Sequence, residues 1–452
     1  MDGLVALAAD DPSAVATALA SLKLPSATSV HQRITPAVAW CEAIREITGR
    51  RPTERRAQLR QMLAAVRRGE RPRVRSWIEV PEAVAAMRVT EIGVGLRSDP
   101  VPALVSTPTD PSGSLDPEAL LARVSAAEQK EWQPWQLDLE QALLRLPRGV
   151  DAWIVSRAAA LRSPAGMKLA RYLAAGPLPD PVASVVGEAT GRPGHRRQDA
   201  QRTSEGARSS GAQLRGRRRV ALTLAGHRSS LHRLLFQLDP SLPPGLPARS
   251  LGTAPSVRPD LLPHHREVTA AWLLTDLNQV LNGNGTAVLP CGTDRGGPAG
   301  PALTLVLAYT IGARNRTHRQ AGLNALLSLS ASGNLNARSL GEHLGGLIAD
   351  EVLPMRLVLP ALSGAIQAGA QADTWDIIAA MLTEVLPGVK APPIALPYLL
   401  TVAADLAASL GARNHIPGLA QLARRNDASR TVHEARRLQA ILAGRPTANS
   451  QP

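Results

Sequence analysis

The densest group of candidate metal ligands is His264, His265 and Glu267, since imidazole and carboxylate groups both bind zinc. A zinc site on a helix needs two histidines four positions apart on one face, whereas adjacent histidines point to different faces. Pro263 suits the first turn of a helix, and Glu267 would lie near the positive end of the helix dipole. The sequence therefore favours a helix N-terminus over a metal site, and no metal is predicted.

Cys291 is the candidate nucleophile, because a thiolate paired with histidine can attack a substrate. It has no recognisable nucleophile frame, and the chain contains no Gly-x-Ser-x-Gly elbow. Cys41 is the other cysteine, so a four-cysteine zinc site is excluded and a reducing compartment fits. Lone cysteines are mostly small buried apolar groups, although a Cys–His pair assembled in space stays an alternative. The chain is predicted not to be an enzyme.

Two common phosphate-binding loops are absent from the sequence. A Walker A loop needs a glycine before the lysine, and none of Lys23, Lys130, Lys168 and Lys390 follows a glycine. The stretch 283–285, Gly-Asn-Gly, lacks the third glycine of a dinucleotide-binding loop and is interpreted as an ordinary loop. No cofactor is predicted.

Positive charge is concentrated in two Arg-rich segments of a chain whose net charge is +14. Residues 45–75 hold eleven arginines and three glutamates, and residues 190–219 hold nine arginines and two acidic residues. Clustered arginines suit phosphates, so non-specific nucleic-acid binding is the alternative function. Against it, few aromatic residues are interleaved for base stacking, and a solvated helix face and a linker explain both segments. The candidate phosphate contacts are Arg196, Arg197, Arg215, Arg217, Arg218 and Arg219.

Trp132 and Trp135 flank Pro134 and form the most unusual aromatic pair of the chain. Tryptophan is enriched at the energetic centres of protein interfaces, so this pair is the candidate interaction point. The alternative, which is more frequent for such pairs, is that the two rings pack into a junction between helices.

The composition favours helices as the elements that position these residues. Apolar residues make up 44% of the chain and aromatics only 2%, and a β-sandwich or barrel usually needs more aromatic and β-branched residues. Two early blocks have helical spacing. They are Ala37, Trp40, Ile44 and Ile47, and then Leu59, Met62, Leu63 and Val66. Asp116 and Pro117 are typical of a helix cap and first turn.

From residue 301 to 443, apolar residues recur at helical spacing in paired blocks. The pairs begin near Pro301, Ser339, Asp373 and His415, which gives a period of roughly 35–45 residues, typical of HEAT-like repeats. Asp373 is predicted to cap its helix, and Gly444 to end the last one. The predicted fold is all-α: an α-solenoid of HEAT-like helix pairs, interrupted by a disordered basic linker.

The chain divides into four predicted parts. Residues 1–105 form an N-terminal helical region, 106–180 a helical-repeat segment, 181–260 a largely disordered Pro/Gly/Arg-rich linker, and 261–445 the C-terminal repeats. Residues 188–217 have too few apolar side chains to offset their chain entropy, and a short extended piece is expected at 220–224. The linker is expected to let the two helical halves move.

No stretch is apolar and long enough to span a membrane, and the N-terminus lacks the basic region of a signal peptide. We therefore expect a cytoplasmic protein that does not bind membranes. Helical repeats bind along an extended surface, which makes another protein the expected partner.

Several blocks resemble an uncharacterised family of bacterial HEAT-like proteins, a domain-of-unknown-function family. The blocks lie at 106–117, 141–146, 163–166, 177–181, 263–268, 297–303 and 411–419. The resemblance covers most of 100–443. It implies a scaffold or accessory role, for example beside an ATPase-containing bacterial system, and it assigns no functional residue.

Overall fold

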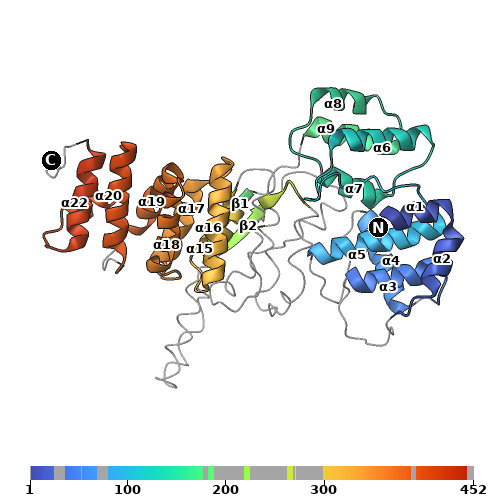
Figure 1. Ribbon diagram of the computed structural model, residues 1–452, viewed down its shortest axis with the longest axis horizontal. Helices are drawn as coiled ribbons and strands as arrows, with labels where there is room; N and C mark the ends of the chain where they lie inside the picture. The colour runs from blue at the N-terminus through green and yellow to red at the C-terminus, as the bar shows by residue number, and fades with distance from the viewer. Residues whose placement is uncertain are drawn as a thin grey trace, which may run out of the picture.

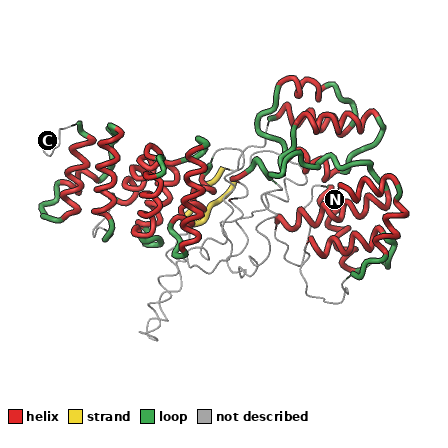
Figure 2. The backbone as a smooth tube through the Cα atoms, viewed as in Figure 1, coloured by secondary structure: helices red, strands yellow, loops and turns green. Residues whose placement is uncertain are grey.

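The computed structural model describes residues 2–24, 36–51, 53–68, 80–176, 182–187, 218–223, 262–267, 270, 299–387 and 393–444. Nearly all of them are helical or lie in turns between helices (Figures 1 and 2), which confirms the all-α prediction. The exception is a two-stranded antiparallel sheet of β1 (Val182–Gly187) and β2 (Arg218–Thr223). The predicted disordered segment 188–217 lies outside the described residues.

Among the first five helices, α3 and α5 meet at small residues. They are α1 (Asp2–Asp10), α2 (Pro12–Ala20), α3 (Pro36–Ile47), α4 (Glu54–Arg67) and α5 (Val80–Ser98). Helix α3 lies close to α5, since a Cβ atom on Gly93 would lie 2.7 Å from the Cβ of Ala43. The buried stripe predicted for α4, from Leu59 to Val66, is confirmed.

Helix α3 covers the apolar block predicted from Ala37 to Ile47, but the most buried residues of the helix are others. Trp40, Ile44 and Ile47 are only half-buried and Ala37 is exposed, whereas Ala39 and Ala43 are fully buried. The physical reason is the close approach of α3 to α5, which alanine permits and larger side chains would prevent.

Four helices follow: α6 (Pro117–Gln129), α7 (Gln136–Leu144), α8 (Ala152–Ala159) and α9 (Pro164–Ala175). The predicted cap of α6 is confirmed, because the Asp116 carboxylate accepts a hydrogen bond from the Glu118 amide at 3.2 Å and Pro117 is the first helical residue. Leu139, Leu143 and Leu146 are buried in the core of this part. We refer to α1–α9 as the N-terminal array.

The C-terminal array holds α15 (Pro301–Ile311), α16 (Arg316–Ala331), α17 (Ala337–Ala349), α18 (Met355–Gln367), α19 (Gln371–Val385), α20 (Leu396–Leu410), α21 (Leu419–Ala423) and α22 (Arg430–Leu442). Helix α17 packs between α15 and α19 in one layer, and α16 packs on α18 in the other. Helices α20 and α22 extend the row beyond α19 (Figure 1). One continuous hydrophobic core runs through this array, from Ala299 to Leu438.

The predicted starts of the helix pairs agree with the helices to within two residues at Pro301, Ser339 and Asp373, whereas the fourth, His415, lies four residues before α21. The predicted cap at Asp373 is wrong, because α19 begins at Gln371 and Asp373 lies in its first turn. The Asp373 carboxylate instead accepts a hydrogen bond from the Ser330 hydroxyl at 2.5 Å, which ties α19 to α16. Gly444 follows α22 with a φ of 71°, the left-handed conformation expected of a helix stop.

Two glycines set the spacing between α17 and α19. A Cβ atom on Gly341 would lie 2.3 Å from the carbonyl oxygen of Ile377, and one on Gly345 would lie 2.6 Å from that of Met381. The two helices therefore touch backbone to backbone at these positions, which requires residues without a side chain.

Candidate functional site: a buried charge network, exposed aromatics and the 262–267 segment

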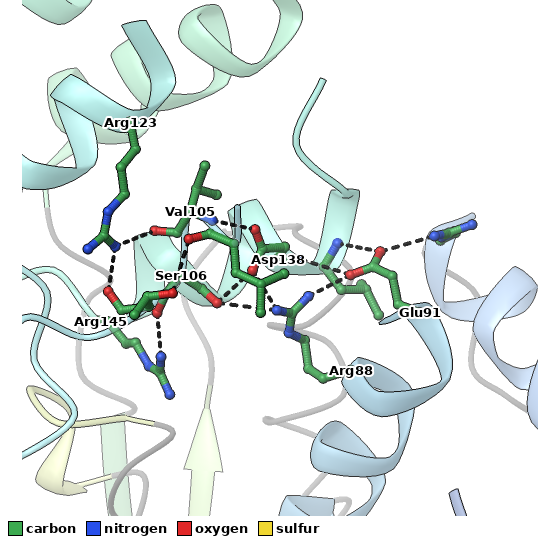
Figure 3. Close-up of polar contacts among 11 residues, drawn as sticks. Arg88, Glu91, Val105, Ser106, Arg123, Asp138 and Arg145 are labelled. Carbon is green, nitrogen blue, oxygen red and sulfur yellow. Dashed lines mark hydrogen bonds and ion pairs between the residues drawn. The ribbon is translucent and has the colours of Figure 1, made fainter. Parts of the chain in front are cut away.

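A network of buried charges joins α5 to α7 (Figure 3). Arg88 on α5 donates to Glu91 on the same helix and to Asp138 on α7, each at 2.6 Å. The Ser106 hydroxyl donates to the same oxygen of Asp138, also at 2.6 Å. All four side chains are buried, so the ion pairs are shielded from water and depend on one another for solvation.

Glu91 also caps a helix to which it does not belong. Its two carboxylate oxygens accept hydrogen bonds from the amides of Leu137 at 2.9 Å and Asp138 at 3.0 Å, in the first turn of α7. The first amides of a helix have no partner within it, and the N-cap residue here is Trp135, which offers no side-chain acceptor. Glu91 therefore supplies to α7 the acceptor that its own sequence lacks.

The same network holds the loop that precedes α6. Asp138 accepts a hydrogen bond from the Val105 amide at 2.7 Å. Arg123 donates to the carbonyl oxygens of Val105 and Thr107, and Arg145 donates to that of Ser106 (Figure 3). Because each oxygen of Glu91 and Asp138 accepts at least one of these bonds, the arrangement positions backbone and suits a structural role.

In the described part of the first Arg-rich segment, five arginines are engaged within the protein. Glu46 lies within 4 Å of Arg56, Arg60 and Arg97. Outside that group, Arg45 pairs with Glu42, Arg67 with Glu91, and Arg50 donates to the carbonyl oxygens of Ala20 and Leu22. These arginines hold α2, α3, α4 and α5 together, which reduces the charge that this face offers to a phosphate.

The second Arg-rich segment is described only at its end. Arg218 and Arg219 lie in β2, where they pair with Gly187 and Val186 of β1. Arg196, Arg197, Arg215 and Arg217 lie outside the described residues, as does Cys291. Phosphate binding by these arginines stays a prediction.

The predicted tryptophan pair lies mostly in the core. Trp135 is 6% exposed, and its indole N–H donates to the carbonyl oxygen of Asp99 at 3.0 Å. A Cβ atom on Gly95 would lie 2.3 Å from the Trp135 ring, so the ring packs on bare backbone of α5. Trp132 is half-buried against the same core. This placement favours the packing alternative, and an interaction role for the pair stays a prediction.

The aromatic residues that do reach the surface were not singled out in the sequence. Trp153 on α8 is 46% exposed, and Tyr398 on α20 is 48% exposed. The helical spacing of the apolar residues could have indicated that Trp153 is exposed. The buried residues of α8 are Ile154 and Ala158, four positions apart, and Trp153 lies outside that stripe. Trp153 is therefore the better candidate for a contact with a partner in the N-terminal array.

The histidine segment lies between the two arrays. The imidazole Nε2 of His264 is 2.8 Å from the Ser114 hydroxyl, and the carbonyl oxygen of His264 accepts a hydrogen bond from Arg148 at 3.0 Å. The Glu267 carboxylate lies at a helix N-terminus, as expected, but the helix is α15 and not its own. Across the described residues, no three His, Cys, Asp or Glu side chains are grouped to hold a metal ion.

Within the described part of the chain, no helix is long and apolar enough to cross a membrane. In comparisons with known proteins, the chain matches no family model, no curated protein and no solved structure.

Proposed function

We propose that this protein is a non-enzymatic helical-repeat scaffold of HEAT-like type that binds another protein. The observation that supports it is the packing of the C-terminal array. Helices two apart in sequence, such as α15 with α17 and α16 with α18, lie side by side around one continuous core. Such stacking leaves long rows of helix surface open to a partner, and the rows can recognise it by shape and charge.

The proposed setting is the cytoplasm of a bacterium, with a role accessory to an ATPase-containing system. The resemblance of the blocks between 100 and 443 to a bacterial HEAT-like family supports this setting. The absence of a membrane-spanning helix in the described residues is compatible with it.

The scaffold is favoured over a basic adaptor for nucleic acid because of how the arginines are used. In the segment 45–68, Arg45, Arg56, Arg60 and Arg67 each face a carboxylate of the same chain. Counterion release on nucleic-acid binding requires cations that are free to meet phosphates. Nucleic-acid binding through the arginines of 190–219 is the alternative that the experiment must distinguish from binding to a protein.

The test is affinity capture of the tagged full chain from its native cytoplasm, with and without nuclease, followed by mass spectrometry. A matched chain lacking 190–219 is the control. The proposal expects a discrete protein partner that survives nuclease and is recovered by both chains. Recovery of nuclease-sensitive material alone, lost with the deletion, would contradict the scaffold and support the nucleic-acid adaptor.

A further inference from the structure

The segment Leu262–Glu267 contacts both helical arrays, although residues 176–261 separate it from the end of α9 and residues 268–300 separate it from the start of α15. Its first residue belongs to the N-terminal array and its last to the C-terminal array. Five residue steps span at most about 18 Å. The points at which the segment contacts the two arrays therefore lie no farther apart than that.

On the N-terminal side, Leu262 is fully buried in the core that holds Leu59, Met87 and Leu137. His264, two residues after Leu262, makes two polar contacts with the N-terminal array. His264 lies 2.8 Å from the Ser114 hydroxyl, and its carbonyl oxygen accepts the Arg148 hydrogen bond. The segment is thus fixed by one apolar anchor and by polar contacts with the loops on either side of α6 and α7.

On the C-terminal side, Glu267 is 1% exposed and its two oxygens accept hydrogen bonds from the amides of Ala302 and Leu303, each at 2.9 Å. These amides open α15, whose N-cap is Gly300 and which has no side-chain cap of its own. A Cβ atom on Gly300 would lie 2.5 Å from the Glu267 carboxyl carbon, so the glycine makes room for the carboxylate. Hydrogen bonds to an ionised carboxylate are stronger than those between neutral groups, and the helix dipole favours a negative charge at an N-terminus. Both effects stabilise the Glu267 carboxylate at the start of α15.

We propose that Leu262–Glu267 is a strap that fixes the orientation of the N-terminal array relative to the C-terminal array. Leu262 and Glu267 are both buried and lie five positions apart, so one array cannot turn far against the other without withdrawing one of them. The sequence predicted that the linker lets the two helical halves move. The strap would prevent this motion, because the residues that follow the linker are held by the N-terminal array at Leu262 and by the C-terminal array at Glu267. The two arrays then present one continuous surface of fixed shape.

The strap is tested in the full chain by measuring the distance between two spin labels. The labels are placed on the exposed residues Ser156 of α8 and Gln367 of α18, in a background with Cys41→Ser and Cys291→Ser. Glu267→Gln is the test variant, because the amide group of glutamine turns a donor toward one of the two α15 amides. Glu342→Gln is the matched control, since Glu342 pairs with Arg338 on the exposed face of α17.

A single narrow distance distribution is expected for the parent chain and for Glu342→Gln. For Glu267→Gln we expect a distribution at least twofold wider, with exchange of the Ala302 and Leu303 amides accelerated at least tenfold. Faster amide exchange with an unchanged distribution would show a local cap only and would overturn the strap, as would a broad distribution in the parent chain. If Glu267→Gln fails to fold, Gly300→Ala replaces it, because its Cβ would lie 2.5 Å from the Glu267 carboxyl carbon and would displace that carboxylate. The same broadening is expected, and an unchanged width would again overturn the strap.

Discussion

Two glutamate carboxylates cap the N-termini of helices that are distant from them in the sequence. Glu91 caps α7 and Glu267 caps α15, and in each case the N-cap residue, Trp135 or Gly300, provides no side-chain oxygen. Neither interaction could be predicted from the sequence, because capping rules compare residues three or four positions apart. The local cap at Asp116 was predictable for the same reason, since it lies directly before the helix that it caps.

Replacing Glu91 with glutamine tests the buried network. The change removes the buried negative charge that pairs with Arg88 and Arg67. Because Arg88 is buried and loses one of its carboxylate partners, we expect the free energy of unfolding to fall by about 3 kcal/mol. Denaturant titration measures this change. Glu342→Gln, which breaks an exposed pair, should cost about 0.5 kcal/mol or less, and equal losses for the two variants would contradict the account.

Glu128 provides a test by pH. Hydrogen bonds from the Ser163 backbone and side chain, and then from the Arg162 amide, hold the pKa of the Glu128 carboxyl below its ordinary value of 4.5. A carboxyl whose pKa is lower in the folded state stabilises that state above pH 4.5, and the contribution is lost as pH falls through the folded pKa. Glu128→Gln should therefore be less stable than the parent chain at pH 7, and the difference should shrink to nothing at strongly acidic pH. A difference that stays constant with pH would contradict this origin.

At the scale of elements, the helices were predictable where the apolar period is local. The predicted starts of the C-terminal pairs lie within two residues of the helices at Pro301, Ser339 and Asp373, because the stripe of buried residues repeats within each helix. The buried face of α3 was not predictable, since it depends on Gly93 of α5, fifty positions away from Ala43. A face made of alanine carries little hydrophobic signal in the sequence alone.

Gly341 and Gly345 test the contact between α17 and α19. Alanine at either position would place a methyl group against a backbone carbonyl that cannot move aside, and we expect each variant to lose about 1–3 kcal/mol of unfolding free energy. Gly364→Ala in α18 is the matched control, because its methyl group would meet only the flexible end of Leu323. The control should be neutral or slightly more stable, since alanine is the better helix former. Thermal unfolding that ranks Gly364→Ala below Gly341→Ala would contradict the backbone contact.

For the whole molecule, the exposed Trp153 is the residue whose removal should affect binding without affecting the fold. Under the proposed scaffold function, Trp153→Ala should weaken the Kd for a captured partner by about thirtyfold, the loss typical of an interface centre. Its free energy of unfolding should change by no more than about 0.5 kcal/mol. Trp135→Ala is the opposite case, because it empties part of the core and should cost about 3–5 kcal/mol. Unchanged binding by Trp153→Ala would remove α8 from the proposed surface.

The arrangement of whole arrays was only partly visible in the sequence. The repeat period indicated the row of helices from α15 to α22, but nothing local connected His264 with Ser114 or Glu267 with Leu303. Those contacts join segments 150 and 36 positions apart, and they decide whether the arrays act separately or together.

Under the proposed function, the protein recognises a protein partner by surface complementarity and not by the charge of its arginines. The most direct measurement is the Kd of the captured partner, taken with the purified full chain by calorimetry at 50 and at 200 mM salt. Surface complementarity predicts a change of a few-fold at most, because apolar and short-range contacts are weakly screened. A loss of about a thousandfold, the effect expected when some six arginines release counterions from phosphates, would contradict the account.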